Sequence, residues 1–174
     1  MPTVPMFNAQ LLGQTEKAAN AILDRLLAEP RLSEPQWVTL SIAAASGGTL
    51  TGGQLTDRVA GALKVSDDEA RERVTELAAR GLVHHPGDDH ATITLTGRGQ
   101  RIYDQIRAAV TEITQRLWGD LPVDDLMTAG RVLETVLARA NVELAKAAAP
   151  TMQKNPPPAR CLSSEPHGRR CAAA

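Results

Sequence analysis

Imidazole and carboxylate groups are common zinc ligands. The residues of these types that could bind a metal ion lie together in one short polar segment. They are His84, His85, Asp88, Asp89 and His90. They fall on opposite faces of a predicted strand and on a turn, with no ordered ligand spacing. Cys161, His167 and Cys171 also match no common zinc module. We therefore expect a polar loop here, with no metal and no cofactor in the protein.

No group of residues has the spacing of a catalytic site. The sequence lacks a glycine-rich phosphate-binding loop, a nucleophile elbow and an HExxH motif. The glycine pairs 47–48 and 52–53 flank a turn and a helix start, where a phosphate cradle is not expected. Asp124 and Asp125 follow Pro122, and a role at the start of a helix explains them better than acid–base chemistry. The sequence thus predicts a protein that is not an enzyme.

The composition favours one helical domain followed by a tail. The chain has 174 residues, of which 43% are hydrophobic and only 2% aromatic, with a net charge of −1. We expect a folded domain over 1–149 and a flexible, basic, Pro-rich tail over 150–174. The tail holds Lys154, Arg160, Arg169 and Arg170 against Glu165, a balance of +3, which leaves −4 for the body. A body with this charge is not an indiscriminate binder of polyanions.

The positions of the two cysteines and the lengths of the apolar segments indicate the cellular compartment of the protein. Both cysteines lie near the C-terminus, whereas a disulfide-built secreted protein distributes cysteines through its fold. No stretch approaches the roughly 18 apolar residues of a membrane span, and no signal peptide is recognisable. We expect a cytoplasmic protein that does not bind membranes.

Three Ser or Thr residues, each followed three positions later by Gln or Glu, predict the starts of three helices. These capping boxes pair Ser33 with Gln36, Thr51 with Gln54, and Ser66 with Glu69. Helical periodicity also covers 7–29, and a long helix begins at Thr96, with another after Pro122. Gly81 is expected to cap the fourth helix, and the runs 82–85 and 91–95 predict a β-hairpin.

Two short helices joined by 62–66 and followed by a hairpin predict a winged helix-turn-helix. In this unit the second helix enters the major groove of DNA and the wing follows the backbone. We therefore expect a mainly α fold with a small β-wing. The winged unit covers about 33–99, and further helices over 7–29 and 97–147 flank it.

The sequence resembles the MarR (multiple antibiotic resistance) regulators over about residues 10–147. The resemblance lies in 33–37, 50–55, 65–66, the run Leu77 to Val83, and Leu95-Thr96-Gly97-Arg98-Gly99. It implies a homodimer whose first, fifth and sixth helices interleave, bound to a palindromic operator in double-stranded DNA. It further implies a ligand-responsive cleft near the dimerisation helices, and most such regulators are repressors.

Apolar stripes on the first helix and the two C-terminal helices favour the dimer independently of the resemblance. The first stripe includes Leu11, Leu12, Ile22, Leu23, Leu26 and Leu27. Together these helices offer more apolar surface than the small winged unit can cover. The alternative is that the stripes pack on one another within one chain.

The fourth helix departs from the family pattern in its charge. Residues 67–76 hold five carboxylates against Arg71 and Arg73, a local charge of −3, which opposes attraction to phosphate. Helix capping and a solvated face explain the same acidity. Arg73 stands where the family has an apolar residue, so we expect it to be half-buried. From the resemblance and from the positions on the outward face of the helix, we expect six residues to contact DNA. They are Thr51, Gln54, Ser66, Arg71, Thr75 and His90.

The wing is the second departure from the family pattern, because its tip, 86–90, has no arginine where the family carries one.

The leading hypothesis is a dimeric DNA-binding regulator released by a small aromatic or apolar effector. Trp37, Tyr103 and Met127 are candidates to line its cleft, although core packing also explains them. The alternative is a MarR-like dimer that has lost DNA binding and serves as a protein-interaction or ligand-binding module.

Overall fold

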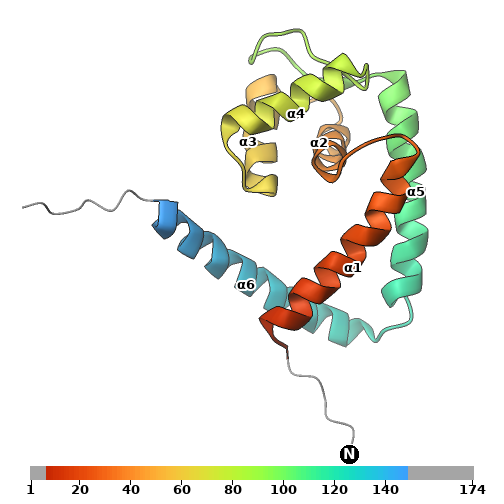
Figure 1. The fold of residues 1–174 in the computed structure, drawn as a ribbon, viewed down its shortest axis with the longest axis vertical. Coiled ribbons are helices and arrows are strands. Elements are labelled where there is room, and N and C mark those ends of the chain that lie inside the picture. The colour runs from red at the N-terminus through yellow and green to blue at the C-terminus, as the bar shows by residue number, and fades with distance from the viewer. Residues whose placement is uncertain (1–6, 149–174) are drawn as a thin grey trace, which may run out of the picture. The chain divides into compact units, whose positions relative to one another are not determined.

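The computed structural model describes residues 7–148, which divide into two units, residues 7–120 and 121–148. The first unit contains, in chain order, α1 (Ala9–Ala28), α2 (Glu34–Ala45), α3 (Gly52–Leu63), α4 (Asp67–Ala79), β1 (Val83–His84), β2 (Thr94–Leu95) and α5 (Gly97–Trp118). The described part of the second unit is α6 (Val123–Ala148). The mainly helical fold (Figure 1) is therefore confirmed, together with its small two-stranded sheet. No helix within residues 7–148 is both long and apolar enough to span a bilayer.

All three predicted capping boxes are present. At the start of α2 the backbone N–H of Gln36 donates to Ser33 Oγ, and the backbone N–H of Ser33 donates to Gln36 Oε1. Thr51 with Gln54 begins α3 in the same way, and Ser66 with Glu69 begins α4. Each box satisfies two backbone donors that a helix start would otherwise leave without partners.

The ends of α3 and α4 are set by residues in the left-handed region. Lys64, at φ 59°, ends α3 and leads into the turn of the helix-turn-helix. Gly81, at φ 65°, follows α4, where its backbone N–H donates to Ala78 O and that of Leu82 donates to Leu77 O. This pair of bonds is the Schellman arrangement, so the predicted cap at Gly81 is confirmed.

The core of the first unit lies between the inner faces of α2, α3 and α4 and the wing. Figure 1 shows these three helices gathered near the end of α1 and the start of α5, and α1 also contacts α5. The buried hydrophobic residues are Leu27, Leu32, Leu40, Ala43, Leu50, Leu55, Val59, Ala70, Val74, Leu77, Leu82, Val83, Ile93 and Ile106. This burial, rather than intrinsic propensity, supplies most of the stability of helices this short.

The wing hairpin is shorter than the sequence predicts. Val83 pairs with Leu95 and His84 with Thr94, and the strands contain only these residues. The first half of the predicted second strand instead pairs with the segment before α3. There Thr92 bridges to Thr51, and the backbone N–H of Ile93 donates to Leu50 O at 2.9 Å. The run 91–95 thus pairs with two segments, β1 and the segment before α3. The side chain of Ile93, between the two pairings, is buried in the core.

The junction between the wing and α5 explains why residue 96 is a threonine and residue 99 a glycine. The Thr96 side chain caps α5 by accepting the N–H of Gly99, and its hydroxyl donates to Gly81 O at 2.7 Å. A Cβ atom at Gly99 would overlap the carbonyl oxygen of Leu82 and lie 2.9 Å from its carbonyl carbon. Only glycine fits at this position.

The second unit's helix α6 has an apolar stripe that is not buried in the described chain. Every side chain from 123 to 147 is exposed, including Leu126, Leu133, Leu137 and Leu144. Apolar side chains at this spacing lie on one side of a helix. The described residues of the chain do not cover them.

Candidate nucleic-acid interface and ligand cleft

The outward face of α4 is the candidate surface for DNA contact. Ala70, Val74 and Leu77 anchor the opposite face in the core, each no more than 2% exposed. Arg71 and Thr75 are one turn apart and both exposed, as the sequence predicts. The Thr75 hydroxyl donates to Arg71 O at 2.9 Å, so its oxygen still has a free lone pair for a ligand donor.

Both arginines of α4 are paired with carboxylates of the same helix. Arg71 Nη1 donates to Asp68 Oδ1 at 2.9 Å. Arg73, which is half-buried as expected, binds Glu72 Oε2 at 2.9 Å and Glu76 Oε1 at 2.6 Å. The helix therefore offers no arginine without a carboxylate partner, and its excess charge is negative.

Three further candidates, Thr51, Gln54 and Ser66, serve as helix caps. Thr51 Oγ1 and Gln54 Oε1 each accept one backbone N–H of the α3 box. Ser66 Oγ donates to Glu69 Oε2 at 2.8 Å and accepts the Glu69 N–H. The bonds from the Ser66 backbone and hydroxyl, with a smaller contribution from Arg73, lower the pKa of Glu69 below its ordinary 4.5. Of these three, Gln54 keeps its Nε2 donors and an exposed side chain.

The wing covers the N-terminus of α3. The backbone N–H of Gly52 donates to Ala91 O at 3.0 Å, and that of Gly53 donates to Asp89 O at 2.9 Å. A Cβ at Gly52 would lie 3.2 Å from the α-carbon of Asp89, so glycine permits this close approach. These amides are engaged by the wing, which leaves no phosphate cradle at this helix start.

His90 lies at the exposed tip of the wing. Its backbone N–H donates to Asp88 Oδ1 at 2.9 Å, which fixes the turn. The tip also exposes Asp89, and residues 86–90 contain no lysine or arginine. His84 is exposed, whereas His85 Nδ1 is buried without a hydrogen-bond partner. Among residues 7–148 no three His, Cys, Asp or Glu side chains group as metal ligands, and the C-terminal cysteines lie outside these residues.

Arg80 has a role that its neighbours in the sequence do not indicate. Its guanidinium donates to the carbonyl oxygens of Pro30 and Arg31 and to Gln36 Oε1. Gln36 Nε2 in turn donates to Glu76 Oε2 at 2.8 Å. Because these partners are separated by 40 to 50 positions, no local pattern could indicate the contacts. Arg80 is thus engaged, while Arg58, Lys64 and Arg101 are exposed, and the exposed Arg98 donates to Arg80 O at 3.4 Å.

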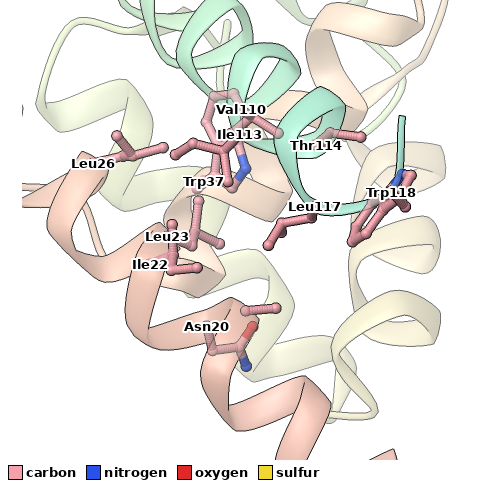
Figure 2. Close-up of a pocket in the computed structure, with 11 residues that line it drawn as sticks. Asn20, Ile22, Leu23, Leu26, Trp37, Val110, Ile113, Thr114, Leu117 and Trp118 are labelled. Atoms are coloured by element: carbon pink, nitrogen blue, oxygen red, sulfur yellow. The ribbon is translucent and has the colours of Figure 1, made fainter. Parts of the chain in front are cut away.

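An apolar cleft of about 200 Å³ lies between α1, α2 and α5. Figure 2 shows Leu23 and Leu26 from α1 and Leu117 and Trp118 from α5 lining it, with Trp37 from α2. Asn20 and Thr114 are the polar side chains in the lining, and no charged side chain of the described residues takes part. The arrangement suits a small uncharged molecule with an aromatic or aliphatic body.

The predicted ligand residues Trp37 and Tyr103 lie together. Their ring centroids are 5.6 Å apart with planes inclined by 26°, and the Arg107 guanidinium lies 5.9 Å from the Tyr103 ring centroid. Trp37 lines the cleft, whereas Tyr103 supports it through the stack. Met127 lies on α6 in the second unit and is exposed.

Two short helices joined by a tight turn, with a hairpin folded against the first of them, define a winged helix-turn-helix. Solved structures that share this fold with the chain include the following three. The Staphylococcus aureus MepR–DNA complex has a TM-score of 0.64 at 17% identity, covering 77% of this chain and 96% of that one. A MarR family transcriptional regulator from Rhodococcus sp. RHA1 has a TM-score of 0.59 at 20% identity, covering 72% and 89%.

The third is the Mycobacterium tuberculosis MarR family protein Rv2887 in complex with DNA, with a TM-score of 0.57 at 21% identity, covering 76% and 98%. No protein-family model and no curated protein matches the sequence. The structural likeness gives the fold: the chain has the winged-helix fold of MarR-type regulators.

Proposed function

We propose that the protein is a homodimeric transcriptional regulator, more specifically a repressor, that binds a palindromic operator in double-stranded DNA. The observation that carries the proposal is the exposed Arg71–Thr75 face of α4, held on a buried core within a winged helix-turn-helix. Two of the structures with the same fold are described as complexes with DNA. Arg71, Thr75 and Gln54 read bases in this account, and His90 contacts the backbone.

The dimer in this proposal is formed by α1, α5 and α6. Exposed apolar side chains gather on the first turns of α1, at the end of α5 and along α6. Exposed apolar surface of this extent marks an interface. A second copy of the chain is the partner that the MarR-type fold supports.

The cleft between α1, α2 and α5 is the proposed effector site. Its lining of Leu23, Leu26, Trp37 and Trp118 selects an apolar or aromatic molecule. Binding there releases the protein from its operator in this account.

A mobility-shift titration at low salt tests the DNA-binding proposal. The probe is the region upstream of the protein's own gene, and a random duplex of equal length is the control. We expect a complex on the upstream region that the random duplex does not displace. The absence of a specific complex would overturn the proposal.

The charge of α4 favours a second function, a dimer that binds a protein partner. Asp68 and Glu72 are exposed, and both arginines of the helix are already paired with carboxylates. In that case a basic protein partner is captured, and reversing the charge of Asp68 and Glu72 to lysine abolishes capture. A partner that still binds the reversed variant counts against this second function.

A further inference from the structure

The side chain of Gln36 joins the start of α2 to the second half of α4. Its Nε2 donates to Glu76 Oε2 at 2.8 Å, and its Oε1 accepts from Arg80 Nη1 at 3.0 Å. The same Oε1 accepts the backbone N–H of Ser33 at 3.1 Å. With three partners the amide has one orientation. We call Gln36, Glu76 and Arg80 the Gln36 junction.

On one side the junction reaches the connection between α1 and α2. Arg80 donates to Pro30 O at 2.7 Å and to Arg31 O at 2.6 Å. Arg31 has φ 54°, a conformation that residues other than glycine rarely adopt. Arg80 therefore holds a strained segment in place directly after α1, whose Leu23 and Leu26 line the cleft.

On the other side the junction reaches the exposed face of α4. Glu76 Oε1 accepts from Arg73 Nη1 at 2.6 Å, and Arg73 Nη2 donates to Glu72 Oε2 at 2.9 Å. Glu76 and Arg80 are four positions apart, so they hold α4 at two successive turns. Gln36 is thus bound both to Glu76 on α4 and to Arg80 directly after it.

We propose that the Gln36 junction couples the cleft to α4, with Gln36 as the positioning residue. Gln36 precedes Trp37, which lines the cleft and stacks on Tyr103. An occupant that moves Trp37, or the end of α1, displaces Gln36 or the Pro30–Arg31 carbonyls, and α4 follows. In the reverse direction, DNA that displaces α4 moves Gln36 and so changes the surroundings of Trp37. The inference rests on the proposed DNA binding.

The test uses Trp37 as the reporter. The full chain with Trp118→Phe keeps Trp37 as its single tryptophan, and its emission is recorded while the upstream duplex is titrated to saturation. We expect DNA to change the Trp37 emission and Gln36→Leu to abolish the change. Ser33→Ala is the matched control, because it removes the hydroxyl that accepts the Gln36 N–H in the capping box and leaves Glu76 and Arg80 bound to Gln36. It keeps the response.

Glu76→Ala is a second variant that leaves the capping box intact, in case Gln36→Leu does not fold. It too is expected to lose the response. An emission change that survives in either folded variant, or no change on saturation with DNA, overturns the coupling and leaves DNA binding in place. Failure of the duplex to bind, seen in the mobility shift, removes the proposed function and the coupling with it.

Discussion

Arg71 donates to the carboxylate of Asp68 at 2.9 Å, one turn earlier on the same helix. The two side chains are 46% and 96% exposed, so water screens the pair. Exposed pairs of this kind contribute about 0–1 kcal/mol. A phosphate or a guanine edge can therefore take the guanidinium at little cost, although the carboxylate opposes DNA when it does.

Asp68→Asn is expected to strengthen DNA binding. The change frees Arg71 and removes one negative charge beside the phosphates, which raises affinity roughly 3- to 10-fold at low salt. Fluorescence anisotropy with a labelled upstream duplex measures the dissociation constant. Asp24→Asn on α1 is the control, because it changes the net charge equally at an exposed position outside α4. Equal effects of the two substitutions would argue against a DNA site on α4.

Gly99→Ala is expected to destabilise the first unit. The added Cβ would collide with the Leu82 carbonyl group, which also accepts the backbone N–H of Thr96 at 3.0 Å. Removing this collision requires α5 to move away from the wing. We therefore expect the free energy of unfolding to fall by about 3 kcal/mol. Urea denaturation followed by circular dichroism measures it.

Gly97→Ala is the matched control for that substitution. A Cβ there would meet only the end of the Arg101 side chain, at 3.7 Å. Restricting the unfolded chain then stabilises the protein by about 0.5 kcal/mol. Equal stability of the two variants would show that Gly99 does not lie against Leu82.

Glu69→Gln is expected to flatten the acid side of the stability profile. Because the folded-state pKa of Glu69 lies below 4.5, ionised Glu69 favours the folded state. That contribution is complete above the unfolded pKa and is lost as the pH falls through the folded pKa. Gln keeps the cap, as it does in the boxes of α2 and α3.

Urea denaturation from neutral pH down to about pH 3 follows this difference. We expect the free energy of unfolding of wild type to exceed that of Glu69→Gln by a constant amount at pH values above 4.5. This difference in stability becomes smaller as the pH falls below 4.5. Glu112→Gln, at an exposed position of α5, controls for the loss of any one carboxylate. A margin independent of pH would contradict the role of the Ser66 bonds.

Leu137→Glu is expected to break the proposed dimer. Leu137 is 57% exposed on α6, and a buried carboxylate without a partner is incompatible with a stable interface. Sedimentation equilibrium should show a monomer. Thr135→Glu places the same charge 200° away around the helix and should leave a dimer. A monomeric wild type would contradict the proposed homodimer.

The local signals of the sequence predicted the helix starts well. Capping boxes at Ser33, Thr51 and Ser66 are short-range patterns, so their outcome depends on neighbouring residues alone. Gly81 was predictable for the same reason. The strand pairing of the wing was harder to predict from the sequence. Whether Thr92 pairs with its own hairpin or with Thr51 depends on the position of α3.

Contacts between distant segments were beyond sequence reasoning. The charge of α4 was countable from the sequence, but the pairing of Arg73 with both Glu72 and Glu76 was not. Arg80 belongs to no recognisable sequence motif, and its engagement by the Pro30 and Arg31 carbonyls depends on how α1 meets α2. Such contacts are specified by packing rather than by spacing.

The central claim, that α4 reads DNA, is tested most directly by comparing the affinity of wild type and Arg71→Ala for the upstream duplex and for a random duplex. Anisotropy titrations over a series of salt concentrations give both affinities. We expect wild type to prefer the upstream duplex, and Arg71→Ala to lose about tenfold of that preference, as for one base contact. Wild-type binding that is absent at low salt, or equal on the two duplexes, would contradict the claim.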